Sequence, residues 1–341
     1  MGPFEGFLCY GAQEVAPEGG DQGAPAGLSR GWSMRIMAWL VQEIMMPEND
    51  IRHLASTAPF RYKVYDIPKR SGGTRTIAQP TAGVKALQIA AVRWLEAGRV
   101  PIHACATAYC KGRSIRYNAA QHVRNSFLLK MDFRDFFHSI VPEDFSGLLI
   151  NRLSSEIDED EMLFLQRLFF WKPRGKPPCL SIGAPSSPFI SNAVMYPFDE
   201  NISEYVTRKG ITYTRYADDL TFSGHDRDDL EATEAWVRYV CQRLPYPHLT
   251  INDRKTVFAS KRYRRTVTGL VLTNDKQISI GRERKRAIRA AVHRFLTRPM
   301  PDDEVARIRG WLACVKDVEP AFFGRLERRY GADGLKRLLK T

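Results

Sequence analysis

Three aspartates have the types and spacing that phosphoryl-transfer chemistry requires. Asp132 follows the apolar run 127–131, which predicts a buried strand. Asp218 and Asp219 separate two β-branched and aromatic runs, which predicts a hairpin with both carboxylates at its tip. If these strands are neighbours in one sheet, the three carboxylates converge at one edge. Such hard oxygen ligands suit Mg²⁺, and two ions about 3.5–4 Å apart can align the reacting oxygens and neutralise their charge.

Each of these aspartates also has an ordinary structural explanation. A single Asp at a strand end is most often a turn or cap residue, and Asp-Asp is common in hairpin turns. The tetrapeptide Tyr216-Ala217-Asp218-Asp219, set between β-branched and aromatic residues, shifts the balance towards the catalytic interpretation.

The charge of the chain indicates its partner. The net charge is +13, from 51 Lys and Arg against 38 Asp and Glu, and such an excess predicts a polyanionic partner. We expect no membrane-spanning segment, secretory signal or lipidation site, so nucleic acid is favoured over an anionic membrane. The six cysteines form no C-x-x-C pair and are expected to be free thiols in a reducing cytoplasm.

The elements that must hold these residues follow from the periodicity of the sequence. Gly- and Pro-rich residues 1–33 predict a flexible tail. The remaining patterns predict helices over 34–46, 82–97, 187–208 and 228–244, and hairpins over 62–77 and 211–222. The order strand, helix, strand, strand, helix, strand from residue 127 onwards matches the split βαβ arrangement.

Four motifs in the expected order resemble the palm of retroviral-type reverse transcriptases. They are Lys130–Phe137, Gly183–Pro188 with Pro185 and Asn192, Tyr216–Asp219, and Asn252–Thr256 with Lys255. Upstream, Ile67–Ile77 is similar to the fingers hairpin of that family. One residue departs from the pattern, because Ile182 stands where the family usually has Gln, and this puts the contacts around the incoming nucleotide in question.

Two shorter motifs narrow the resemblance to bacterial retron reverse transcriptases. Asn118 to His122 fits the N-A-x-x-H pattern of those enzymes, and Val267-Thr268-Gly269 fits their V-T-G triplet. His122 alone would be read as a satisfied histidine inside a helix. The two motifs together, each in its proper place, favour the retron interpretation.

The resemblance implies an α+β fold of the right-hand polymerase type, with a split βαβ palm and a short helical thumb. We expect fingers over residues 34–128, a palm over 129–278 with finger insertions at about 141–180, and a basic thumb over 279–341. It also implies two Mg²⁺ ions, held by Asp132, Asp218 and Asp219.

Roles for individual side chains follow from the same resemblance. Lys69 and Arg75 of the fingers hairpin would hold the incoming triphosphate. Phe137 would lie under the nucleotide sugar and exclude a 2′-hydroxyl, although it could instead be a core aromatic residue. Phe133 and Lys255 complete the expected nucleotide contacts.

A basic run near the C-terminus would bind RNA as part of the thumb. The run consists of Arg282, Arg284, Lys285, Arg286 and Arg289. A solvated helix face is the usual explanation for such a run, but its place directly after a polymerase palm favours contact with backbone phosphates.

The implied activity is RNA-directed DNA synthesis on a cognate structured non-coding RNA. Priming from a guanosine 2′-hydroxyl would give branched RNA–DNA, known as msDNA, and a separate effector protein would complete an antiphage defence system. Two alternatives remain: a group II intron-type reverse transcriptase, which needs further segments after the thumb, and an inactive RNA-binding scaffold. Primer extension separates the scaffold from an enzyme.

Overall fold

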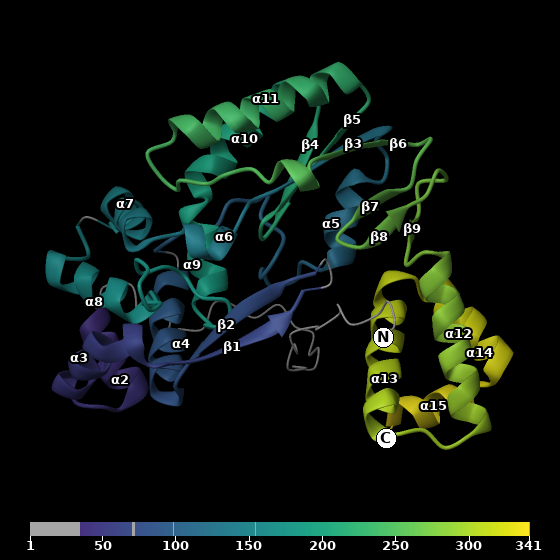
Figure 1. The fold of residues 1–341 in the computed structure, drawn as a ribbon, viewed down its shortest axis with the longest axis horizontal. Coiled ribbons are helices and arrows are strands. Elements are labelled where there is room, and N and C mark those ends of the chain that lie inside the picture. The colour runs from purple at the N-terminus through teal and green to yellow at the C-terminus, as the bar shows by residue number, and fades with distance from the viewer. Residues whose placement is uncertain (1–34, 70–71, 98, 154, 341) are drawn as a thin grey trace, which may run out of the picture. The chain divides into compact units, whose positions relative to one another are not determined.

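The computed structural model describes residues 35–69, 72–97, 99–153 and 155–340 (Figure 1). The predicted tail over 1–33 lies outside these ranges. The described residues pack into two compact units: a larger one of residues 35–112 and 127–258, and a smaller one of residues 113–126 and 259–340. The two units are defined by packing contacts and do not test the predicted bounds of fingers, palm and thumb.

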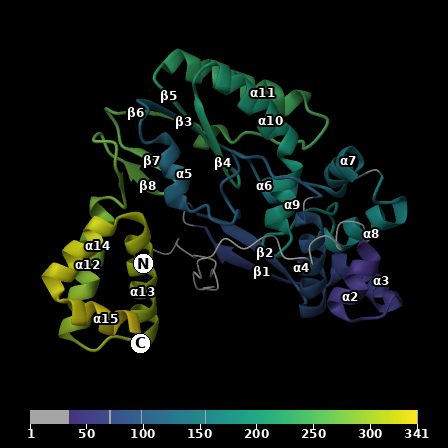
Figure 2. The ribbon, with the colours of Figure 1, turned by 180° about the vertical axis from the view of Figure 1, so that it is seen from behind.

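A four-stranded sheet forms the centre of the larger unit. Its strand order is β4 (Thr212–Tyr216), β5 (Asp219–Gly224), β3 (Phe127–Asp132) and β6 (Val257–Ser260). Helices α10 (Tyr196–Arg208) and α11 (Arg227–Arg243) lie side by side against this sheet, as Figure 2 shows from behind. This is the split arrangement that the element order predicts.

The predicted helix over 187–208 is two helices in the structure. α9 (Ser187–Val194) ends at Met195, and α10 begins directly afterwards with Pro197 in its first turn. Proline lacks a backbone N–H and clashes with the carbonyl four residues before it, so it starts a new helix more easily than it continues one. The expectation of one continuous helix was therefore wrong at this point.

Six further helices of the larger unit contribute to the same hydrophobic core as the central sheet. They are α2 (Ile36–Ile44), α3 (Glu48–Thr57), α4 (Ala82–Glu96), α6 (Phe136–Ser139), α7 (Pro142–Leu153) and α8 (Glu159–Phe169). α8 begins with a capping box, in which Asp158 accepts from the Glu161 backbone and Glu161 accepts in return. Arg35 donates to both of these carboxylates and so fixes the start of α2 against α8.

A hairpin of β1 (Tyr62–Pro68) and β2 (Thr74–Pro80) extends from these helices with β1 largely exposed. The backbone N–H of Ala78 donates to the Ile182 carbonyl at 2.9 Å, which fastens β2 to the segment before α9. The next residue, Gly183, has φ +120°, and a Cβ there would lie 3.0 Å from the Ala78 oxygen. Only glycine permits this close approach of two backbones.

The smaller unit combines a short sheet with several helices. α5 (Ile115–His122) packs against β7 (Arg265–Val267), β8 (Leu270–Leu272) and β9 (Ile278–Ser279). The chain continues through α12 (Arg282–Thr297), α13 (Asp302–Val318), α14 (Pro320–Tyr330) and α15 (Ala332–Lys340). No helix among the described residues has the length and apolar character needed to cross a bilayer. The five cysteines in the described ranges are free, as the sequence predicts.

Candidate active site

The structure brings the three predicted carboxylates together at one end of the central sheet. Asp132 is the last residue of β3 and pairs in register with Asp219, the first residue of β5. The backbone N–H of Phe133 donates to the Asp218 carbonyl at 3.2 Å, so the turn lies directly beside the end of β3. Asp132 is 3% exposed, and Asp218 and Asp219 are partly buried. The convergence inferred from strand order is therefore present.

Asp132 is held by two residues from the fourth palm-like motif. The Asn252 side-chain amide donates to its Oδ1 at 3.2 Å, and the Lys255 ammonium lies 2.8 Å from its Oδ2. The Asn252 backbone N–H also donates to the Asp132 carbonyl at 2.8 Å. Lys255 was predicted to contact nucleotide, and its side chain is 57% exposed, so it can reach a phosphate beside Asp132. The contact made by Asn252 was not expected from the sequence.

The electrostatics of this group favour a bound cation. Burial, followed by the charges of Asp219 and Asp132, raises the pKa of Asp218 to about 6. The pKa of Asp219 is also raised, chiefly by burial. Carboxylates that repel one another in a partly buried place are relieved when a divalent cation joins them. An all-oxygen donor set of this kind fits Mg²⁺.

Three of the five predicted nucleotide contacts lie on the β1–β2 hairpin and on α6 of the larger unit. Lys69 and Arg75 are exposed on the β1–β2 hairpin, where the Lys69 N–H donates to the Gly73 carbonyl. Phe137 is half-buried on α6, with its ring centroid 5.3 Å from that of Phe136. The Phe137 side chain packs against the core and is partly exposed.

Phe133 occupies a different environment from the one its predicted role requires. It is 2% exposed, and its ring lies 5.8 Å from that of Phe136 and 5.4 Å from that of Phe198. The ring therefore belongs to the core, and any contact of this residue with a nucleotide must come from its backbone.

The second palm-like motif contributes mainly through its backbone and its buried amide. Gly183 and Pro185 precede α9, and the Ile182 carbonyl holds β2 as described above. The Asn192 side chain is fully buried; it donates to the Ala108 carbonyl at 2.9 Å and accepts from Arg215 at 3.0 Å. Asn192 thus supports the site from within the core.

The two retron-like motifs, far apart in sequence, lie side by side in the smaller unit. Asn118 and His122 are fully buried on α5. The Thr268 hydroxyl donates to the Ile115 carbonyl of the same helix at 3.3 Å. Burial lowers the pKa of His122 to about 3, so the imidazole is neutral at physiological pH. This environment supports a structural role for His122 inside its helix.

The basic run on α12 divides into exposed and engaged side chains. Arg282 and Arg286 are exposed. Lys285 forms an ion pair with Glu319 at 2.5 Å, and Arg284 donates to the Gly269 carbonyl at 2.8 Å. Arg289 lies over the Phe322 ring at 5.2 Å. Three of the five predicted RNA contacts therefore also hold the smaller unit together.

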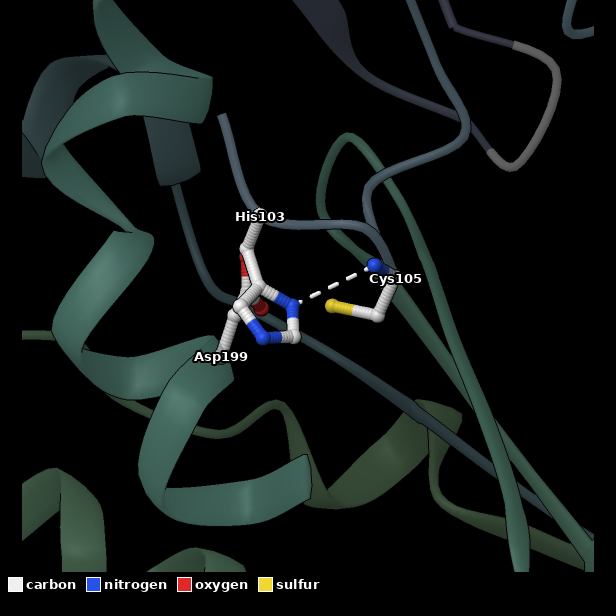
Figure 3. A group of neighbouring side chains, drawn as sticks. All are labelled: His103, Cys105 and Asp199. Atoms are coloured by element: carbon white, nitrogen blue, oxygen red, sulfur yellow. Dashed lines mark hydrogen bonds between the residues drawn. The ribbon is translucent and has the colours of Figure 1, made fainter. Parts of the chain in front are cut away.

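A separate group of possible metal ligands is linked through Arg215 to the turn that contains Asp218. Figure 3 shows His103 and Cys105 on one loop and Asp199 on α10. Both Asp199 oxygens accept hydrogen bonds from Arg215, and the Cys105 backbone N–H donates to His103 Nδ1. Burial and the Asp199 charge raise the pKa of the Cys105 thiol well above its ordinary value. The Arg215 guanidinium engages both Asp199 oxygens and repels a cation, so the structure favours a hydrogen-bond network at this place.

Three carboxylates at adjoining strand ends are a donor set that suits the metal ions of nucleotidyl transfer. The family described as "Reverse transcriptase (RNA-dependent DNA polymerase)" matches residues 67–277. The chain belongs to this family, in its bacterial retron branch, and is an RNA-directed DNA polymerase.

Several curated relatives place the chain in that branch. It is 41% identical over 297 residues to the retron Ec83 reverse transcriptase of Escherichia coli, covering 86% of this chain and 94% of the relative. The retron Ec86 reverse transcriptase of the same organism is 32% identical over 300 residues, with 84% and 88% covered. Among solved structures, apo telomerase from Candida tropicalis matches with a TM-score of 0.47 at 10% identity. The match covers 75% of this chain and 52% of the telomerase chain.

Proposed function

We propose that this RNA-directed DNA polymerase copies part of a cognate structured non-coding RNA, with Asp132, Asp218 and Asp219 as the ligands of two Mg²⁺ ions. The observation that carries the catalytic part is the register pairing of Asp132 with Asp219, with Asp218 in the adjoining turn. Bound Mg²⁺ would neutralise the triphosphate and favour ionisation of the attacking hydroxyl. Asn252 and Lys255 keep Asp132 oriented towards that place.

The remaining residues of the larger unit would select and hold the nucleotide. Lys69 and Arg75 lie on an exposed hairpin that forms a two-stranded sheet by itself, so they can approach a triphosphate from outside the central sheet. The half-buried ring of Phe137, four residues beyond the core ring of Phe133, would block a ribose 2′-hydroxyl. Deoxynucleotides would therefore be preferred over ribonucleotides.

The proposed RNA reaction is self-primed from a guanosine 2′-hydroxyl and yields branched RNA–DNA, or msDNA. Support comes from the kinship to proteins named retron reverse transcriptases and from the two retron-like motifs packed together in the smaller unit. Exposed Arg282 and Arg286 offer phosphate contacts for that RNA. We further propose that the enzyme acts in the cytoplasm in antiphage defence, with a separate effector protein as partner.

The branched product can be tested directly. The protein is expressed from its own genomic segment, and the nucleic acid that copurifies with it is sequenced and treated with an enzyme that cleaves 2′,5′-linkages. A branched product would separate into one RNA and one DNA strand, each with a defined end, and would be missing when Asp218→Ala protein is expressed. DNA that copurifies with a free 5′ end and no attached RNA would contradict self-priming. RNA without any DNA would favour the scaffold alternative.

A further inference from the structure

We infer that Arg215 is a positioning residue for the catalytic turn, because its buried guanidinium ties that turn to α9 and α10. The inference rests on the proposed role of Asp218 as a metal ligand. Arg215 lies on β4, three residues before Asp218, and its side chain is fully buried. Neither the motif pattern nor the charge count marks this arginine, since it sits among β-branched and aromatic residues.

The guanidinium contacts three different parts of the larger unit. Its Nε and Nη2 donate to both Asp199 oxygens, at 2.9 Å and 2.6 Å for the shortest contacts. Its Nη1 donates to the Asn192 side-chain oxygen at 3.0 Å and to the Ala217 carbonyl at 3.2 Å. Asp199 belongs to α10 and Asn192 to α9, whereas Ala217 is the residue directly before Asp218.

The contact with the Ala217 carbonyl bears directly on the orientation of Asp218. The Ala217 carbonyl and the Asp218 N–H belong to one planar peptide unit. A hydrogen bond that fixes the Ala217 oxygen therefore also fixes the position of the Asp218 backbone nitrogen. Ala217 has φ +56°, a left-handed conformation that residues other than glycine adopt only when the surroundings enforce it. Arg215 supplies one such constraint from inside the core.

The backbone of Arg215 is anchored as firmly as its side chain. Its N–H donates to the Cys105 carbonyl at 2.9 Å, and its carbonyl accepts from the Thr107 N–H at 2.8 Å and the Thr107 hydroxyl at 3.0 Å. Asp199 also accepts from the Tyr213 hydroxyl at 2.8 Å. Through these hydrogen bonds the guanidinium fixes the turn relative to α9 and α10.

The geometry requires arginine in particular. A planar guanidinium presents five donors in a fixed fork, whereas a lysine ammonium is a single nitrogen that cannot reach the two Asp199 oxygens, Asn192 and Ala217 together. A buried ion pair often adds little stability over apolar residues of similar size, while removing one partner leaves an uncompensated buried charge. Stability and positioning can therefore be separated by replacing both partners.

The decisive variants are Arg215→Lys and the double variant Arg215→Met/Asp199→Leu. We measure the single-turnover rate of primer extension, the Mg²⁺ concentration for half-maximal rate, the KM for dNTP, binding of primer-template and thermal unfolding. Both variants should bind primer-template normally with an unchanged KM for dNTP. Their rates should fall about 10²-fold, as for a small misplacement of reacting groups, and more Mg²⁺ should be needed. The matched control is Arg227→Met/Glu231→Leu, which removes an exposed ion pair of α11 and should change none of these quantities.

Each outcome decides the inference. A folded double variant with the parent rate and Mg²⁺ dependence would overturn it, and so would a fully active Arg215→Lys protein, whether or not the double variant folds. Asp218→Ala is measured in parallel. If Asp218→Ala extends primers, the proposed catalytic carboxylates fail; if Asp218→Ala is inactive while the Arg215 variants are unaffected, only the positioning role fails.

Discussion

Asp132 illustrates how single residues of this site depend on partners far away in the sequence. Its two oxygens accept hydrogen bonds from Asn252 and Lys255, which lie 120 and 123 residues later in the sequence. These contacts hold the Asp132 carboxylate at the end of β3. The Lys255 charge partly offsets the repulsion between the carboxylates of Asp132, Asp218 and Asp219. Together, the charges of Lys130 and Lys255 offset part of the mutual repulsion of the three carboxylates.

Phe137 provides the first prediction at the residue scale. Phe137→Val removes the ring that would block a 2′-hydroxyl, so discrimination between dNTP and the matching rNTP should fall roughly 10- to 100-fold. The measurement is the ratio of kcat/KM for the two nucleotides on one primer-template. Phe136→Leu is the control, since Phe136 is 3% exposed and should affect stability without changing the ratio. An unchanged ratio in an active Phe137→Val enzyme would return Phe137 to the core.

Sequence alone predicts that Asp132, Asp218 and Asp219 lie together, but it predicts their surroundings less well. Strand ends and hairpin tips are local features, so Asp132, Asp218 and Asp219 can be placed from local patterns. The burial of Phe133 and the contact of Asn252 depend on how distant segments pack, which local patterns do not encode. The same limit applies to Arg215 on β4 and Asp199 on α10, because the local sequence around a charged residue gives no indication of a distant partner.

At the scale of elements, α12 carries two kinds of basic side chain. Arg282 and Arg286 are exposed one turn apart, whereas Lys285 is fixed by Glu319 on the segment before α14. The sequence marks this segment as a basic run on a helix, but the pairing of Lys285 becomes visible only in the folded unit. The strands β7, β8 and β9, of two or three residues each, are too short to give a periodic signal.

This division of α12 leads to a prediction about RNA binding. Arg282→Gln/Arg286→Gln should weaken binding to the copurifying RNA and lower the slope of log K against log salt by roughly 0.7–0.9 for each phosphate that the protein no longer neutralises. Titrations at several salt concentrations measure the slope. Arg52→Gln/Lys85→Gln, which alters two exposed cations of α3 and α4, is the charge-matched control. Equal slopes for both double variants and the parent would mean that α12 is only a charged surface.

His122 on α5 gives a pH prediction. Its pKa is about 3 in the folded protein, because burial disfavours the charged imidazole, against 6.5 as the ordinary value. The unfolded chain therefore binds a proton below pH 6.5 that the folded chain excludes until about pH 3. The stability from this group is complete above pH 6.5 and declines as the pH falls, by about 2 kcal/mol at pH 5.

The variant His122→Gln should remove this part of the pH dependence. Its free energy of unfolding should change less between pH 7.5 and pH 5 than that of the parent, even if the variant is less stable throughout. Denaturant titrations at both pH values give the comparison, and His53→Gln, which alters an exposed histidine, should keep the parent's dependence. Identical pH dependence in His122→Gln would mean that another group titrates.

At the scale of the whole molecule, the chain combines two packing units with separate proposed tasks. The larger unit contains the groups proposed to act on a nucleotide, among them the carboxylates, the hairpin, Lys255 and the half-buried Phe137. The smaller unit joins α5 to the V-T-G turn and α12, although α5 lies before the central sheet in sequence. A division of the chain by sequence order alone could not anticipate that α5, within residues 113–126, packs with the strands β7, β8 and β9.

The central claim is that Asp132, Asp218 and Asp219 carry RNA-directed DNA synthesis, and primer extension on an annealed RNA template tests it most directly. Parent, Asp218→Ala and Asp50→Ala proteins are compared with dNTPs and Mg²⁺, after circular dichroism and template binding have shown that each is folded. Asp50, an exposed residue of α3, is the matched control. We expect the parent and Asp50→Ala proteins to synthesise DNA at equal rates. The Asp218→Ala protein should bind template without extending the primer. DNA synthesis by folded Asp218→Ala protein would contradict the central claim.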